Sequence, residues 1–161
     1  MKRSGYIQRR TPLNKKSTSD TAECKDRIQA LVRQIVMIRD GGCFLRNMYG
    51  IPVCNGFRRD GEQILQADHL ITRANSATYA DTRLIVCVCK GHHGWKKWHE
   101  REYNAFLKER VLSPERVALW DACERDSWRP TRTTSYDWLK TEVALKQELT
   151  EIMHATAHEA A

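Results

Sequence analysis

The sequence predicts an α+β fold in which two short central strands are flanked by helices on both sides. Apolar residues repeat at helical spacing before residue 43 and again after residue 94. Two short apolar runs, EQILQADHL and LIVCVC, lie between these segments and are typical of strands. The chain has 161 residues, 41% of them apolar, which is long enough for one core and too short for two enzyme domains.

The N-terminal elements have clear boundary signals. The first helix is predicted over residues 19–42, because polar and acidic residues open it and Gly41 falls at its end. Glycine, proline and Asn-Gly or Asp-Gly pairs fill residues 43–61, so turns are expected there. The strands are predicted at residues 62–70 and 84–89, separated by a polar loop.

Three helices are predicted in the C-terminal half. The first covers residues 95–111, with Trp95 and Trp98 expected in the core rather than stacked on bases. A Ser-Pro-Glu start predicts the second over residues 113–125, and the third covers about residues 135–156. These last two helices could pack on the rest of the chain, form a dimer or dock another protein.

The charge distribution points to an anionic partner. The net charge is +7, and residues 1–18 contain no acidic residue. A basic arm without an apolar face is expected to lack fixed structure; it is either a solvated tail or, as the charge favours, an arm that follows a phosphate backbone. No apolar run approaches the length of a membrane span or a secretory signal, so a cytoplasmic location is expected. The basic side chains of the arm are Lys2, Arg3, Arg9, Arg10, Lys15 and Lys16.

Four of the six cysteines lie in the less periodic, turn-rich part of the chain. The sequence has no recognisable export signal, so the thiols are expected to be reduced and to bind metal rather than form disulfides. Cys43 and Cys54 bracket the turn-rich segment, and Cys89 and His92 form a C-x-x-H pair. Together they predict a structural zinc site with three sulfur ligands and one nitrogen. Cys87 could replace Cys89, because residues two apart share one face of a strand.

A second group of polar residues is expected to lie together. Asp68 and His69 fall at the end of the first strand, and His93 falls at the start of the following helix. If the strands form a hairpin that the helix crosses, Asp68 and His93 could hold a hard divalent cation. The His69 imidazole could then accept a proton from water. Three basic residues flank this point and could contact a phosphate backbone: Lys90, Lys96 and Lys97.

The motifs CFLRNMYGIPVCNG, QADHLITR and LIVCVCKGHHGWK resemble the HNH endonuclease superfamily, the ββα-metal or His-Me finger fold. Phage-type members, the NinG-like and Ref-like recombination nucleases, are the most similar in character because they too begin with basic segments. The resemblance covers residues 43–100. It implies a small zinc-supported nuclease core in which His69 activates water while Asp68 and His93 bind the catalytic metal.

The chain departs from the family at the middle Asn of the motif. That position is occupied by Leu84 or by Thr82, depending on which cysteine is used for counting. The Asn usually orients the catalytic histidine, so another group must orient His69. Asn75, Asp81 or a backbone carbonyl could take this role.

The resemblance implies an endonuclease that hydrolyses DNA phosphodiester bonds with Mg²⁺ or Mn²⁺ and leaves 5′-phosphates. Little sequence specificity is expected, and a recombinase filament is a candidate partner. The resemblance divides the chain into a basic arm (1–19), an HNH-type domain with its leading helix (20–112) and a helical extension (113–161). Two alternatives remain: a zinc-stabilised DNA-binding accessory protein without catalysis, and a zinc protein that binds only protein.

Overall fold

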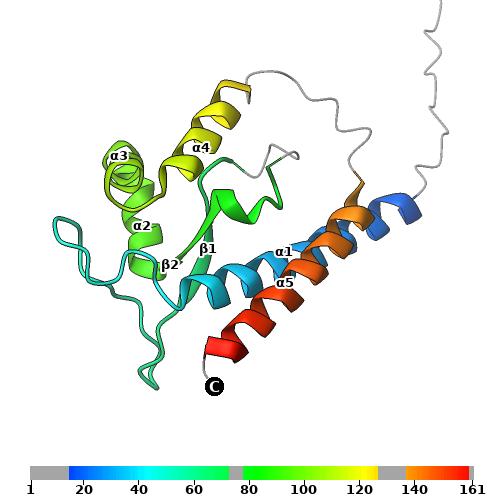
Figure 1. Ribbon diagram of the computed structural model, residues 1–161, viewed down its shortest axis with the longest axis horizontal. Helices are drawn as coiled ribbons and strands as arrows, with labels where there is room; N and C mark the ends of the chain where they lie inside the picture. The colour runs from blue at the N-terminus through cyan, green and yellow to red at the C-terminus, as the bar shows by residue number, and fades with distance from the viewer. Residues whose placement is uncertain (1–14, 73–77, 127–136, 160–161) are drawn as a thin grey trace, which may run out of the picture.

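The computed structural model describes residues 15–72, 78–126 and 137–159. Within these ranges it contains five α-helices and one two-stranded antiparallel sheet, which confirms the α+β class (Figure 1). The elements in chain order are α1 (Lys15–Asp40), β1 (Leu65–His69), the 3-10 turn η1 (Thr82–Leu84), β2 (Ile85–Cys89), α2 (Lys90–Trp98), α3 (Glu100–Arg110), α4 (Pro114–Asp126) and α5 (Trp138–Glu159).

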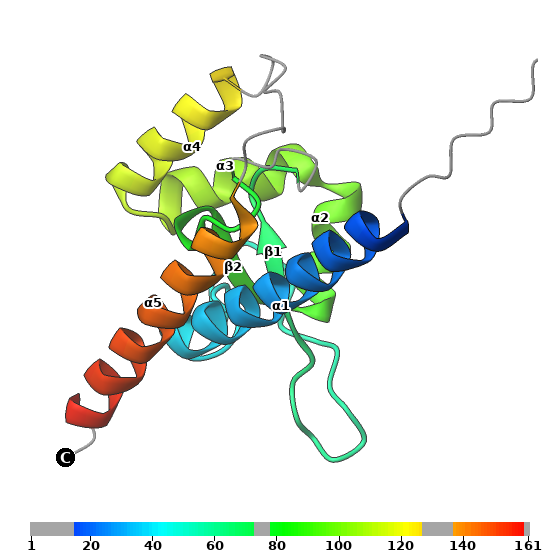
Figure 2. The ribbon, with the colours of Figure 1, turned by 90° about the vertical axis from the view of Figure 1, so that its right-hand side faces the viewer.

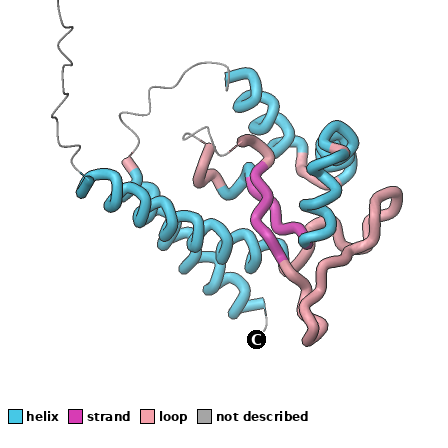
Figure 3. The backbone as a smooth tube through the Cα atoms, turned by 180° about the vertical axis from the view of Figure 1, so that it is seen from behind, coloured by secondary structure: helices cyan, strands magenta, loops and turns pink. Residues whose placement is uncertain are grey.

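The hairpin is covered on both faces. Its register runs from Leu65 opposite Cys89 to His69 opposite Ile85. Every residue of β2 is buried, which explains why this strand is a continuous apolar run without alternation. Helices α1 and α5 lie on one side of the hairpin and α2, α3 and α4 on the other (Figures 1 and 2). The tube view from behind shows the two strands between these layers (Figure 3).

The C-terminal helix packs along the first helix. Cys24, Ile28, Val32 and Ile35 recur at helical spacing on α1 and are buried in one cluster with Leu145 of α5. Arg27 and Glu142 add a 3.0 Å ion pair across this contact. The buried face of α5 therefore packs on the rest of the chain, which is one of the three roles that the sequence left open for this helix.

The predicted helix over residues 95–111 consists of two helices. Helix α2 starts earlier, at Lys90, because the Cys89 side chain accepts the His92 backbone N–H and caps it. The chain turns at His99, and α3 then packs Tyr103 and Leu107 into the core. The expectation for Trp98 is wrong: it is the last residue of α2 and 79% exposed, whereas Trp95 packs against the core.

Helix α1 begins at Lys15, four residues before the predicted start. The sequence between Pro12 and this point has no further proline or glycine to stop a helix from starting there. The other expected arm residues, Lys2, Arg3, Arg9 and Arg10, lie outside the described residues, and the side chains of Lys15 and Lys16 are not described. None of the described helices is long and apolar enough to cross a membrane.

Candidate functional site

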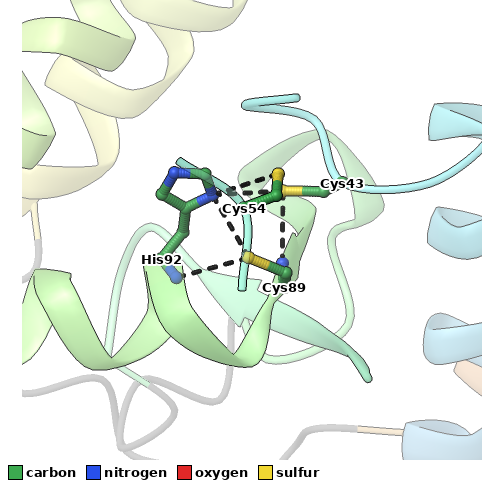
Figure 4. Close-up of side chains that lie close together, drawn as sticks. All are labelled: Cys43, Cys54, Cys89 and His92. Atoms are coloured by element: carbon green, nitrogen blue, oxygen red, sulfur yellow. Dashed lines mark hydrogen bonds between the residues drawn. The ribbon is translucent and has the colours of Figure 1, made fainter. Parts of the chain in front are cut away.

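Four predicted zinc ligands lie together at the junction of the turn-rich segment, β2 and α2 (Figure 4). Cys43 follows α1, Cys54 lies within the turn-rich segment, Cys89 ends β2, and His92 lies in the first turn of α2. One donor atom from each residue lies within 4.8 Å of the other three. This cluster of three sulfurs and one nitrogen could hold a metal such as zinc.

The His92 ring is oriented for metal binding. Its Nε2 lies 2.6 Å from the Pro52 carbonyl oxygen, so Nε2 carries the proton and donates. The Nδ1 lone pair then faces the sulfurs, at 3.3 Å from Cys43 and from Cys89 and 3.8 Å from Cys54. A second hydrogen bond that fixes the tautomer of a ligating histidine is typical of metal centres. The side chains therefore fit zinc.

A close approach holds the loop against the start of α2. A Cβ placed on Gly91 would lie 1.6 Å from Oδ1 of Asn55, so any larger residue there would force the Asn55 side chain to move. Gly56, with φ of +82°, approaches Lys90 in the same way, since a Cβ there would lie 2.8 Å from the Lys90 Cβ. These glycines bring Cys54 next to Cys89 and His92.

Without a metal, two of the three thiols favour the protonated form. Burial raises the pKa of Cys43, and burial together with the neighbouring Cys43 raises the pKa of Cys54 to about 11. Burial also opposes ionisation of Cys89, but backbone N–H groups of His92 and Asn55 outweigh it and lower its pKa. Of the three thiols, Cys89 therefore loses its proton most readily, and binding of zinc would displace protons from the thiols that remain protonated.

Cys87, the expected substitute for Cys89, lies outside the four-residue cluster. It is buried against α1, and this burial raises the pKa of its thiol to about 12. Cys89 belongs to the other cluster because the chain turns into α2 at that residue. The structure thus separates two cysteines that strand alternation alone would place on one face.

Asp68 lies at the centre of a second polar group, on the α2 and α3 side of the hairpin. It is 3% exposed. Lys96 Nζ donates to both carboxylate oxygens, at 2.9 and 3.0 Å. The Tyr103 hydroxyl donates to Oδ2 at 2.8 Å, and His93 Nε2 lies 3.6 Å from Oδ1. Burial and the adjacent carboxylate raise the pKa of Tyr103, so its hydroxyl stays protonated as a donor.

His69 does not point to this group. Its Nε2 lies 3.3 Å from the Tyr79 carbonyl oxygen, on the side of the hairpin that faces α1. This follows from strand alternation, because neighbouring residues of β1 project to opposite faces. A backbone carbonyl, that of Tyr79, thus accepts a hydrogen bond from the His69 ring. Asp81 instead caps η1 and pairs with Arg83, and Asn75 lies outside the described residues.

Two cavities meet at His93. One, of about 490 Å³, is lined by Asp68, His93, Lys96 and Lys97, among others. Lys97, which lines this cavity, and Lys90, at the start of α2, are both exposed, as expected for cations that contact phosphates. Lys96 differs from that expectation, because its ammonium group is bound to Asp68 and to the His69 carbonyl.

Sequence reasoning missed the two partners that fix the Asp68 carboxylate. Tyr103 lies 35 residues from Asp68, and within its helix it has only the ordinary pattern of a buried position. Lys96 is predicted from the sequence to contact a phosphate backbone, not Asp68. No local signal links either residue to the strand.

Comparison of the chain with protein-family models, with curated proteins and with solved structures gives no match.

Proposed function

We propose that this chain is a metal-dependent endonuclease that hydrolyses phosphodiester bonds in DNA on a zinc-supported ββα-metal core. The observation that carries the proposal is the approach of His93 to Asp68, 3.6 Å apart, where the hairpin meets the following helix. The order strand, strand, helix and the cluster of Cys43, Cys54, Cys89 and His92 beside it are consistent with the resemblance of the motifs.

Zinc in this cluster would have a structural role. All four donors are protein side chains, so a tetrahedral ion would have no open position for a substrate. Such an ion would fix the turn-rich loop and the first turn of α2. It would thereby set the direction of His93, which directly follows a ligand.

The chain's own residues would divide the catalytic work. Asp68 and His93 would hold a Mg²⁺ or Mn²⁺ ion, which when bound stabilises negative charge on the phosphate. They supply one carboxylate and one imidazole, and the ion must replace the Lys96 ammonium on Asp68. The His69 ring donates from Nε2 to Tyr79 on the opposite face of β1 from Asp68, so its proposed role as the base, through Nδ1, requires the ring to turn toward the metal site when substrate binds.

Exposed basic side chains near the cavity and in the N-terminal arm favour a polyanion, although the acidic Glu100 also lines the cavity. Lys97 and Lys90 are exposed on α2, and residues 1–18 add basic side chains. Contacts of this kind bind the phosphate backbone without reading base sequence, and their affinity falls as salt rises. DNA with little sequence preference is therefore the proposed substrate.

One observation favours a second function. The Asp68 carboxylate is neutralised by Lys96 and accepts a further hydrogen bond from Tyr103. A carboxylate with a purely structural role would be paired in the same way. If the ammonium is never displaced, the chain would be a zinc-stabilised DNA-binding protein that does not cut.

A plasmid assay separates the two functions. Purified protein with Mg²⁺ or Mn²⁺ should nick supercoiled DNA. The variants Asp68→Asn, His69→Ala and His93→Ala should each lose roughly a hundred-fold or more of this activity, in the range that general acid–base groups contribute. His154→Ala is the matched control, because its side chain is exposed on α5 and outside both clusters.

The results would be read with a binding measurement on the same samples. A salt-sensitive gel shift without any nicking would support the second function and exclude the nuclease. Nicking that persists in all three site variants would reveal a contaminating enzyme. Thermal unfolding of each variant shows whether lost activity reflects lost structure.

A further inference from the structure

A second cavity adjoins His93 on the opposite side from Lys97. It has a volume of about 420 Å³ and lies between α1, β1 and the start of α2. Helices α1 and α2 both lie alongside β1 (Figure 2). Its volume is within the roughly 300–1,000 Å³ of small-ligand sites. The lining residues are Gln29, Ala30, Arg33, Gln66, Ala67 and His93.

Two amide groups of this cavity have unused hydrogen-bonding capacity. Gln29 Nε2 and Gln66 Oε1 are both buried, and neither has a hydrogen-bond partner among the described residues. Leaving a buried polar atom unpaired is unfavourable, and such atoms in a native structure call for an explanation. One is a donor and the other an acceptor; both are shielded from solvent as the side chains stand, so a ligand in the cavity reaches them only when the terminal amides turn.

The backbone of β1 adds a second donor and acceptor. Backbone groups of Ile64 and Leu70 hydrogen-bond to the segment that contains β2. In an antiparallel pair this direction alternates along the strand, so even-numbered residues of β1 face β2 and odd-numbered residues face away from it. The N–H and carbonyl of Ala67 therefore point to the outer edge of β1, where the cavity lies. On the same edge, Arg33 donates to the Leu65 carbonyl at 3.1 Å, which holds its guanidinium at the cavity.

Adjacent donors and acceptors match the edge of a nucleobase. Every base has such an edge, and glutamine amides are among the side chains that pair with it. In a duplex the base edge that pairs is already occupied, and a base enters an enclosed pocket only after it leaves the stack. The Arg33 cation at the cavity suits the attached phosphate.

The cavity is continuous with the proposed cleavage site. Gln66 and Asp68 are two residues apart on β1, so their side chains share a face and are separated by roughly 6.6 Å. His93 lines both cavities. We infer that the cavity of Gln29, Gln66 and Arg33 binds an unpaired nucleobase next to the phosphate held at Asp68 and His93. This inference rests on the proposed function and makes single-stranded or locally unpaired DNA the preferred substrate.

Binding without the catalytic metal tests the inference. The zinc-loaded chain, without Mg²⁺ or Mn²⁺, is titrated into a short fluorescein-labelled single strand, the same strand with every base removed, and the matching duplex. The single strand should bind best. The double variant Gln29→Leu and Gln66→Leu should lose roughly ten-fold in affinity for the single strand, the scale of one good base contact, and nothing for the abasic strand.

Gln34→Leu is the matched control, because it makes the same change on an exposed face of α1. It should leave all three affinities unchanged. A double variant that unfolds is replaced by a measurement on the unchanged chain: NMR signals of the Gln29 and Gln66 amides should shift with the single strand and not with the abasic strand.

Equal binding of the normal and abasic strands would overturn the inference, since the cavity would then hold only a phosphate. Because the assay contains no catalytic metal, the two proposals fail separately. Plasmid that stays uncut while the amides respond to bases would exclude the nuclease. Cleavage that depends on Asp68 but not on bases would exclude the base site alone.

Discussion

Removal of metal from the cluster of Cys43, Cys54, Cys89 and His92 should release the turn-rich segment. Within residues 43–61, Cys43 and Leu45 are the only buried residues. Burying Leu45 contributes about 1.5–3 kcal/mol, whereas structural zinc in small domains contributes about 10–16 kcal/mol. The metal would therefore supply most of the free energy that orders this segment.

The assay compares three chains by metal content and by hydrogen exchange. The unchanged chain should contain one zinc ion. Cys54→Ala should lose it, because the substitution removes one of the four ligands. Cys54 is only partly buried, so the substitution leaves little cavity. Exchange should then rise over residues 43–61 and the first turn of α2. The contact between α1 and α5 should stay protected, since it belongs to the other cluster.

Cys87→Ala is the matched control. This thiol is buried outside the metal cluster, so its loss should cost about 1 kcal/mol, as small buried deletions do, and should leave the zinc content unchanged. Full zinc content in Cys54→Ala, or loss of zinc in Cys87→Ala, would refute the ligand set. A chelated chain with unchanged exchange over residues 43–61 would refute the structural role.

Three further outcomes are expected. Gly91→Ala should destabilise the chain because its Cβ would displace the Asn55 side chain, whereas Gly94→Ala, with nothing within 4 Å, should stabilise α2 by about 1 kcal/mol in thermal or urea unfolding. Lys96→Met should cost about 3–5 kcal/mol by leaving Asp68 buried without its cation, and added Mn²⁺ should restore the melting temperature if the ion takes that place. The pKa of Glu142 is lowered to about 2, chiefly by Arg27, so its stabilisation is complete above its ordinary pKa and disappears as the pH falls toward 2. The difference in melting temperature between the unchanged chain and Glu142→Gln should thus be constant at neutral pH and narrow below about pH 4.3.

Periodicity predicted the elements because each buries a face in the expected way. The apolar positions of α1 repeat at helical spacing and pack on β2 and α5. The run LIVCVC has no alternation because both of its faces are buried. The break at His99 left no signal, since residues on both sides of it favour helix and only packing of Tyr103 requires the turn.

The metal cluster was predictable because its ligands occur in local patterns. A Cys-x-x-His pair at the start of a helix and two cysteines that bracket a turn-rich segment leave few other groupings. The surroundings of Asp68 were not predictable in this way. Tyr103 reaches the carboxylate from another helix, and no spacing rule in the sequence relates the two positions.

The metal cluster and the Asp68 group depend on each other through the rotation of α2. His92 and His93 are neighbours on a helix, so their side chains project about 100° apart, one into the sulfur cluster and one toward Asp68. Lys96 lies three residues after His93 and shares its face, so both reach the same carboxylate. Fixing His92 in the cluster therefore fixes which side chains meet Asp68. A helix free to rotate by one residue would take His93 away from the carboxylate, and for this reason an ion bound at His92 would determine which side chains meet Asp68 without contacting Asp68 itself.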